Sequence, residues 1–160
     1  NFKNVKEPIE NGCSFAQNAK IKSQFGFEKF KIPCFADDSG FCIDALNNKP
    51  GIHSKRFIQK FSSSKKAFEY IITNAIKKKN NKAFFVTAIS LTLEKNHHII
   101  FFGKINGKLS LAPKGVNGFG YDPIFIPDNH NKTFAEMSPK EKNSISHRKQ
   151  AISKLKSFLF

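Results

Sequence analysis

The sequence predicts an α/β fold within a single domain of 160 residues. Apolar residues recur at steps of three and four between residues 64 and 79, which is the period of an amphipathic helix. Residues 83–93 and 98–105 are rich in aromatic and β-branched side chains, which favour strands. Hydrophobic residues make up 39% of the chain and 19 positions are Phe, so a disordered chain is excluded and a packed core is expected.

The formal net charge of +15 raises the question of nucleic-acid binding. Of the 27 basic residues only Arg56 and Arg148 are arginine, the side chain that forks onto phosphate and guanine. The shortage of arginine argues against sequence-specific binding to nucleic acid. We therefore expect the positive charge to attract small anionic substrates.

Hydropathy and cysteine content narrow the cellular setting. No run approaches the ~20 apolar residues that a membrane-spanning helix needs, so no membrane partner is expected. Cys13, Cys34 and Cys42 are odd in number and lack the spacing of a metal site. Free thiols in a reducing cytoplasm are the simplest explanation, which predicts a cytoplasmic protein.

The first helix is predicted over residues 15–25. Ser14 and Gln17 have the S-x-x-Q spacing of a capping box, in which Ser caps the third amide and Gln reaches back to the cap. Gly26 follows as a helix stop. Lys22 projects from the middle of this helix, where a solvated surface side chain is the ordinary role of a lysine.

Two adjacent carboxylates follow the next apolar run. Residues 34–36 have the composition of the end of a buried strand, and Asp37-Asp38-Ser39-Gly40 comes directly after them. Successive strand residues point to opposite faces, so both acids face one cleft only if the backbone kinks between them. The pair favours a hard cation such as Mg²⁺. The alternative is a turn in which Asp and Ser bond their own backbone.

Short elements and connections are predicted on either side of the amphipathic helix. Residues 41–46 form a short strand or extended segment, 47–51 a turn and 51–57 a loop. Residues 94–97 are few enough to join the two long strands as an antiparallel hairpin. Asn106-Gly107 is a further turn signal.

A glycine-rich stretch over residues 115–125 is the second candidate for chemistry. Its glycines permit close backbone approach, Phe119 offers a stacking face for a base, and Asp122 an acceptor for the base edge. The spacing is neither that of a Walker loop nor that of a dinucleotide-binding loop. A tight aromatic turn remains the alternative.

The C-terminal region predicts two helices. Ser138, followed by Pro and then by Glu141, is a helix start, and Ser146 starts or continues the last helix. Apolar positions of the last helix are expected to pack inward: Ala151, Ile152, Leu155, Phe158 and Leu159. The junction between the helices gathers cationic or titratable side chains, unless they merely form a solvated basic face: Lys142, His147 and Arg148.

Taken together, residues 35–51, 118–125 and 142–148 resemble the inosine/xanthosine triphosphate pyrophosphatase family, whose members remove non-standard purine nucleoside triphosphates. The resemblance runs from about Glu10 to the C-terminus in three ordered motifs. It implies an elongated, two-lobed α/β fold around a long mixed sheet with flanking helices. It also implies an active-site cleft between the lobes and a homodimer.

The resemblance further implies Mg²⁺-dependent hydrolysis between the α and β phosphates of ITP, dITP or XTP. Asp38 would be the general base and a metal ligand, Glu10 the second metal ligand, and Asp37 a supporting carboxylate. The remaining matched positions would bind the phosphates or line the nucleotide pocket: Lys22, Ser39, Phe119, Gly120, Tyr121, Asp122, Lys142, His147 and Arg148.

The sequence departs from the family pattern at its beginning. Residues 1–10 have extended character and contain no S/T-x-N-x-x-K segment before Glu10, so the single domain over residues 1–160 is expected to lack the family's N-terminal strand and phosphate loop. Gln17 stands where Glu is common, and Lys149 where Gly often follows the Ser-His-Arg triplet. Two alternative functions remain open: a basic nucleic-acid-binding domain without catalysis, and a related pyrophosphatase for modified pyrimidine nucleotides.

Overall fold

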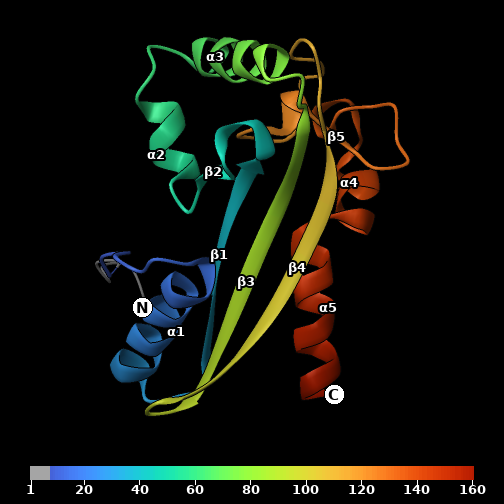
Figure 1. The fold of residues 1–160 in the computed structure, drawn as a ribbon. Helices are drawn as coiled ribbons and strands as arrows, with labels where there is room; N and C mark the ends of the chain where they lie inside the picture. The colour runs from blue at the N-terminus through green and yellow to red at the C-terminus, as the bar shows by residue number, and fades with distance from the viewer. Residues whose placement is uncertain (1–7) are drawn as a thin grey trace.

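A long, twisted sheet forms the axis of an elongated molecule in the computed structural model, which describes residues 8–160 (Figure 1). The predicted extended character of residues 1–7, and the predicted lack of a phosphate loop there, lie outside the described residues. Helices cover both faces and the upper end of the sheet, so the α/β prediction is confirmed. None of the helices within residues 8–160 is both long and apolar enough to cross a bilayer.

The described sheet has the order β2-β1-β3-β4-β5, and every pairing is antiparallel. Its strands are β1 (Cys34–Ile43), β2 (Lys49–Gly51), β3 (Lys82–Glu94), β4 (His97–Leu109) and β5 (Phe125–Pro127). The prediction of a mixed sheet is therefore wrong for residues 8–160. Within these residues no two neighbouring strands run parallel: β3 and β4 form the predicted hairpin through a short turn with Asn96 at φ 65°, a single 3-10 turn, Asp44–Leu46, returns β2 along β1, and β1 runs antiparallel to β3.

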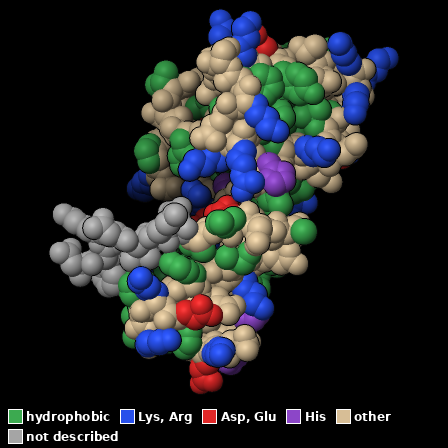
Figure 2. All heavy atoms as spheres, turned by 90° about the vertical axis from the view of Figure 1, so that its left-hand side faces the viewer, with side chains coloured by type: hydrophobic (Ala, Val, Ile, Leu, Met, Phe, Trp, Pro, Cys, Tyr) green, Lys and Arg blue, Asp and Glu red, His purple; other side chains and the backbone are tan. Residues whose placement is uncertain are grey.

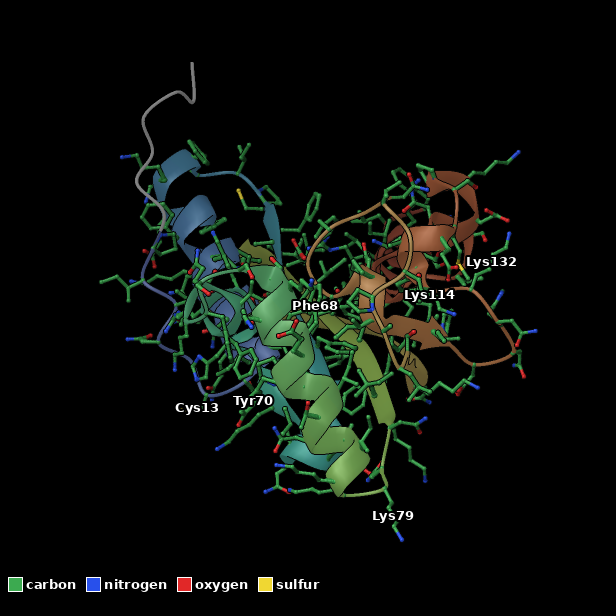
Figure 3. The ribbon with its side chains drawn as sticks, turned by 90° about the horizontal axis from the view of Figure 1, so that it is seen from above. Cys13, Phe68, Tyr70, Lys79, Lys114 and Lys132 are labelled. Atoms are coloured by element: carbon green, nitrogen blue, oxygen red, sulfur yellow. The ribbon has the colours of Figure 1, made fainter. Side chains whose placement is uncertain are left out.

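Two lobes lie along the length of β3 and β4 (Figure 1). At the lower end, α1 (Phe15–Phe30) packs on one face of β1 and β3, and α5 (His147–Leu159) on the opposite face of β3 and β4. The upper lobe contains α2 (Ser54–Gln59), α3 (Ser64–Lys77), β5 and α4 (Pro139–Ile145). Seen from above, α3 lies across the upper end of the sheet, and Lys79 projects outward just beyond it (Figure 3). The predicted two-lobed arrangement is thus present.

The main core fills the upper lobe and is dominated by aromatic rings. Phe41, Phe85 and Phe125 pack against one another, with ring centroids 4.6 Å apart for Phe41 and Phe85 and 4.9 Å for Phe85 and Phe125. Aromatic pairs at such separations add to the stabilisation from area burial. A smaller cluster, which includes Ala151 and Leu155, seats α5 on the lower sheet. The upper lobe therefore has the larger core, and one side of it forms the wall of the cleft described below.

Helix α3 and the β3–β4 hairpin confirm their predictions, whereas the limits of other elements differ. Helix α1 continues through Gly26 to Phe30, because this glycine lets the helix approach β1: a Cβ on Gly26 would lie 3.2 Å from Cys34. The predicted turn at Asn106-Gly107 is wrong, since both residues lie in β4 and a Cβ on Gly107 would lie 2.3 Å from the Ile126 carbonyl oxygen. These glycines serve close packing rather than turns.

Tertiary contacts explain the remaining differences. Part of the predicted loop over residues 51–57 is the start of α2, whose first residue, Ser54, is anchored because its hydroxyl donates to the Gly51 carbonyl oxygen at 2.6 Å. Ala151 and Leu155 of α5 are buried as predicted. Three other apolar positions of α5 are substantially exposed, because the helix covers the sheet with only one stripe: Ile152, Phe158 and Leu159.

Candidate active site

A cavity of about 640 Å³ lies between the lobes, where β1 passes from one to the other. In Figure 2, acidic side chains lie within this hollow, and Lys and Arg side chains gather on its upper side. Every residue that the sequence predicted for the site lines this one cavity: Glu10, Lys22, Asp37, Asp38, Ser39, Phe119, Gly120, Tyr121, Asp122, Lys142, His147 and Arg148. Segments that are far apart in the chain are therefore brought together, while the role of each residue remains a prediction.

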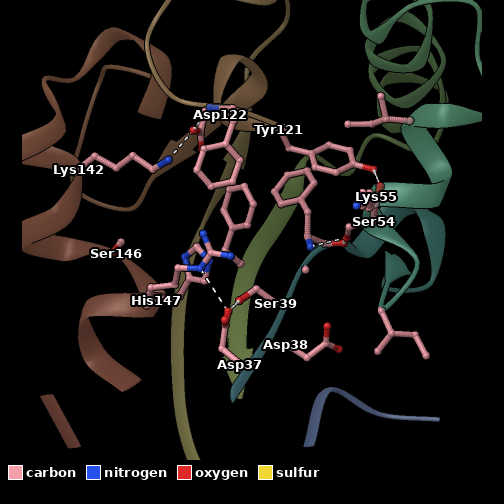
Figure 4. Close-up of a pocket in the computed structure, with 18 of the residues that line it drawn as sticks. Asp37, Asp38, Ser39, Ser54, Lys55, Tyr121, Asp122, Lys142, Ser146 and His147 are labelled. Carbon is pink, nitrogen blue, oxygen red and sulfur yellow. Dashed lines mark hydrogen bonds and ion pairs between the residues drawn. The ribbon is translucent and has the colours of Figure 1, made fainter. Parts of the chain in front are cut away.

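The Asp37-Asp38 pair lies within β1 rather than in a turn. The pairing of β1 with β3 is continuous from Cys34 to Ile43, so the turn alternative is wrong and the backbone has no register shift at the acids. Asp37 and Asp38 point to opposite sides of the strand (Figure 4). Both still reach the cavity, because β2 pairs only with residues 41–43 and leaves the acidic part of β1 as an edge. No kink is needed.

The side of β1 that faces α1 carries a cluster of opposite charges. Lys22 Nζ lies 2.9 Å from Glu10 Oε1 and 3.6 Å from Asp38 Oδ1. Burial raises the pKa of the Asp38 carboxyl above its ordinary value, although the Lys22 charge and a hydrogen bond from Asn18 oppose the shift. Asp38 is only 7% exposed. A buried carboxylate in this position gains from any further cation.

This donor set fits Mg²⁺ bound together with a phosphate substrate. Glu10 and Asp38 come from different segments and already converge on one ammonium group. Across residues 8–160 there is no cluster of three or more His, Cys, Asp or Glu side chains that could enclose a metal. Mg²⁺ commonly binds through one or two carboxylates, with waters and substrate phosphates as its other ligands. Two carboxylates at an open cleft satisfy that requirement.

The opposite side of β1 carries two hydrogen bonds and an ion pair, which together reach from β3 to α5. The Ser39 hydroxyl donates to Asp37 Oδ2 at 2.9 Å and lies 2.5 Å from the hydroxyl of Thr87 on β3. Because the Ser39 proton is directed to Asp37, the Thr87 hydroxyl must be the donor to Ser39. Arg148 Nε lies 3.5 Å from Asp37 Oδ2. Asp37 is thus held between a serine and an arginine.

The glycine-rich loop brings an aromatic ring to the rim of the cavity. Gly118 and Gly120 have φ of 75° and 61°, a left-handed conformation that side chains disfavour. Asp122 Oδ2 accepts from the Phe119 amide at 2.7 Å and from Lys142 Nζ at 2.5 Å. Phe119 is 66% exposed, with Lys142 Nζ 4.6 Å from the centroid of its ring. The loop therefore presents a ring face to the cleft, while one Asp122 oxygen is already engaged.

His147 is the first residue of α5 and lies in the deeper part of the cavity wall. Its ring stacks on Phe85 with centroids 4.9 Å apart and planes at 9°. Burial, together with the charges of Arg148 and Lys142, lowers the pKa of His147 to about 3. Its Nδ1 is buried and has no hydrogen-bond partner among the described residues. At neutral pH the ring is uncharged and keeps an unused polar atom.

Several residues that line the cavity were not predicted from the sequence. Phe41 and Phe85 line the cavity from strands, and Ser54 lines it from α2. The Phe41 amide donates to the Ser54 hydroxyl at 2.8 Å, and the Tyr121 hydroxyl donates to the Ser54 carbonyl oxygen at 2.8 Å. Strand composition alone does not tell which Phe faces a cleft. A serine followed by a short helix is likewise too common to mark an anchor.

The chain is similar to known proteins over most of its length. Residues 1–158 match the Ham1 family. The chain is 37% identical to the dITP/XTP pyrophosphatase of Aquifex aeolicus, over 93% of the chain and 78% of that protein. It is 41% identical to the dITP/XTP pyrophosphatase of Zymomonas mobilis, over 94% of the chain and 74% of that protein.

Solved structures agree with the fold. The structure of a HAM1 protein from Coxiella burnetii aligns with a TM-score of 0.90 at 36% identity, covering 97% of this chain and 81% of that one. The Ham1 protein of Staphylococcus aureus aligns with a TM-score of 0.89 at 35% identity, covering 96% of this chain and 80% of that one. Sequence and fold similarity therefore extend over both lobes.

Proposed function

This chain belongs to the Ham1 family, and on that premise we propose that it hydrolyses non-canonical purine nucleoside triphosphates, namely ITP, dITP and XTP. The products would be the nucleoside monophosphate and pyrophosphate. The observation that carries the proposal is the cavity itself, in which carboxylates, cations and an exposed aromatic ring line one space of about 640 Å³. Hydrolysis of a purine nucleoside triphosphate uses all three: carboxylates for the metal and the water, cations for the phosphates, and an aromatic ring for the base.

The acidic cluster would supply the hydrolytic chemistry. Mg²⁺ held by Glu10 and Asp38 would neutralise negative charge on the phosphate oxygens. Asp38 would accept a proton from a water molecule while the oxygen of that water attacks the α-phosphorus. The α–β anhydride bond then breaks, and its electron pair leaves with pyrophosphate. Burial raises the pKa of Asp38, which suits a carboxylate that must hold a proton during the reaction.

The cationic side chains would hold the triphosphate. Lys22 now bridges Glu10 and Asp38, and the same ammonium group would bind phosphate oxygens once a metal shares those carboxylates. Lys142 would contact the phosphates from the opposite lobe, where it is bound to Asp122. Lysine binds phosphate as a compact point charge, so neither contact requires a fixed angle.

The base would lie against the glycine-rich loop and the start of α5. Phe119 would stack on the purine ring, and Arg148, oriented by Asp37, would donate to O6 of a 6-oxo purine. Adenine carries an amino donor at that position, which would leave the guanidinium without an acceptor. Three further residues would complete the wall around the nucleotide: Ser39, Gly120 and Tyr121.

We propose a homodimer as the working assembly and the cytoplasm as its setting. Exposed apolar side chains near the lower part of the sheet support a protein partner there, among them Ile32, Phe35 and Leu159. The three cysteines are free, as expected in a reducing compartment. Residues 1–160 would act as one pyrophosphatase domain in each protomer.

Pyrophosphate release from ITP in the presence of Mg²⁺ tests the function directly. We expect release by the wild-type protein and a loss of about 10²–10⁴-fold in Asp38→Asn, which removes the proton acceptor while keeping the side-chain shape. Nucleotide binding, measured calorimetrically, should persist in this variant. Asp44→Asn is the matched control, because Asp44 bonds to Asn80 outside the cavity.

A folded wild-type protein without pyrophosphate release would contradict the proposal. Salt-sensitive binding to polynucleotide that survives Asp38→Asn would then favour the basic binding domain. Faster release from modified pyrimidine triphosphates than from ITP would instead favour the related pyrimidine enzyme.

A further inference from the structure

Asn18 lies at the start of α1, directly behind the acidic cluster, and belongs to none of the motifs that predicted the site. It is only 2% exposed. Its Nδ2 donates to Asp38 Oδ2 at 3.2 Å, and its Oδ1 accepts from the Gly12 amide at 2.9 Å. One side chain therefore links the buried carboxylate of β1 to the segment that carries Glu10.

The direction of the Asn18 amide is fixed by its surroundings. The backbone amide of Gly12 can only donate, so the atom that faces it must be the carbonyl oxygen. The amino group is then directed at Asp38, where a carboxylate can only accept. The position requires one acceptor and one donor on a single rigid plane. Asparagine provides this, whereas leucine provides neither and aspartate only the acceptor.

The segment before α1 is held tightly against Asn18. A Cβ on Gly12 would lie 2.7 Å from Asn18 Oδ1, so the absence of a side chain permits this contact. The neighbouring amide of Cys13 donates to Gln17 Oε1 at 2.6 Å. On the other side, Arg56 Nη2 donates to the carbonyl oxygen of Glu10 at 3.2 Å. The backbone around Glu10 is thus anchored to both α1 and α2.

The two oxygens of Asp38 have separate partners. Oδ2 faces Asn18, while Oδ1 lies 3.6 Å from Lys22 Nζ, the group that also contacts Glu10. Fixing Oδ2 on the protein side leaves Oδ1 directed at the space shared with Glu10. Hydrogen bonds from partners behind a metal ligand commonly set its orientation.

We propose that Asn18 is a positioning residue, which sets the orientation of the Asp38 carboxylate and its separation from Glu10. This inference rests on the proposed function, because it assigns those two carboxylates to one cation. Asn18 touches neither substrate nor metal and acts through Asp38 and Gly12. The site for a divalent cation is then built by α1 as well as by the residues that would bind the ion.

The test measures Mn²⁺ binding to the full chain by electron paramagnetic resonance, alongside steady-state hydrolysis of ITP. Asn18→Leu removes both hydrogen bonds at similar volume, and Gly12→Ala pushes the segment away from an intact Asn18. We expect each to weaken Mn²⁺ binding and to lower kcat by about 10- to 100-fold. The KM for ITP at saturating metal should stay within about twofold, since no phosphate or base contact is removed.

Gln24→Leu is the matched control on the same helix, because Gln24 bonds to Glu28 and lies outside the cavity. It should match the wild type in both measurements. If Asn18→Leu does not fold, Gly12→Ala decides, because Gly12 has no positive φ that would strain an alanine backbone, and the added Cβ displaces the segment while Asn18 stays intact.

Folded variants that bind Mn²⁺ and turn over ITP like the wild type would overturn the inference. A wild-type chain that binds no Mn²⁺ would overturn it as well. A wild-type chain that binds Mn²⁺ but releases no pyrophosphate would refute the proposed function alone, and the Mn²⁺ affinities of the variants would still decide the role of Asn18.

Discussion

His147 shows how burial at the site affects the stability of the chain. Its pKa is about 3 in the folded protein because the ring is buried against Phe85. In an unfolded chain a histidine titrates near its ordinary value of about 6.5. Between these values the unfolded state binds a proton that the folded state does not, so folding becomes less favourable as the pH falls.

We predict that replacing His147 with Gln removes this part of the pH dependence. Between pH 7.5 and pH 5.5 the wild type should lose about 1 kcal/mol more of its unfolding free energy than His147→Gln does. Urea unfolding at several pH values, without nucleotide, measures the difference. Parallel stability curves for the two proteins would show that His147 is accessible to protons in the folded state.

The residues of the site differ in how far the sequence could predict them. Asp38 and Arg148 belong to motifs that resemble those of a known family, and this resemblance predicts that both residues line one cavity. Asn18 and Thr87 belong to no such motif, because a polar residue in a helix or strand has many ordinary uses. Only the fold shows that one faces Asp38 and the other Ser39. Supporting hydrogen bonds depend on which elements pack together, and that information is not local.

Contact between β4 and α5 determines where the Ser-His-Arg segment lies. Gly103 of β4 faces the start of α5, and a Cβ there would lie 1.9 Å from the His147 carbonyl oxygen. This oxygen belongs to the backbone of α5. The Ser146 hydroxyl caps the same helix by accepting a hydrogen bond from the Lys149 amide. Helix and strand can approach this closely only with glycine at this position.

Gly103→Ala is therefore predicted to destabilise the protein by about 2–3 kcal/mol, as overpacking does. It should also raise the KM for ITP, because the start of α5 carries His147 and Arg148. Thermal unfolding and steady-state kinetics provide the measurements. Lys108→Ala, an exposed site on the same strand, should change stability by less than about 0.5 kcal/mol. Equal effects of the two variants would refute the close contact.

Elements with strong periodicity were predictable, and those defined by tertiary contact were not. The amphipathic pattern of α3 and the aromatic β3–β4 hairpin follow from local sequence. The continuation of α1 through Gly26 and the place of Gly107 within β4 do not, since both glycines also fit a helix stop or a turn. Whether such a glycine ends a helix, forms a turn or permits close packing depends on the strand that lies against it.

Charge acts at the scale of the whole molecule. The chain carries a formal charge of +15, and Lys and Arg side chains gather at the upper side of the cleft (Figure 2). A field of one sign around a concave site raises the local concentration of an oppositely charged ligand. For a triphosphate, the benefit should depend on ionic strength because salt screens exposed charges.

We predict that kcat/KM for ITP falls several-fold as NaCl rises from about 50 to about 500 mM, where the Debye length shortens from more than 10 Å to about 4 Å. The kcat at saturating ITP should change little, because bound substrate no longer depends on attraction from a distance. A salt-independent kcat/KM would mean that the surface charge has no part in capture.

The arrangement of the lobes was predictable only through resemblance to a family. Composition and periodicity predict helices and strands in one domain, but they do not say that a cleft separates two lobes. The strand directions show the limit, since the described sheet is antiparallel where a mixed one was expected. The β3–β4 hairpin follows from local sequence, but the direction of β1 against β3 depends on a long connection through α2 and α3, which local sequence does not orient.

The passage of β1 through the cleft has a consequence for how this stretch can change over time. Asp37 is paired with Ile89 and Asp38 with Ala88, and the two acids serve different neighbours on the two faces of one strand. A deletion of one residue just before them would rotate each acid into the surroundings of the other, although the composition of the site would be unaltered. A point substitution here changes one side chain and can have a small effect on the site. An insertion or deletion moves every shifted side chain to the other face of the strand, so its effect cannot be small. The number of residues along β1 therefore matters to the site as much as their identity.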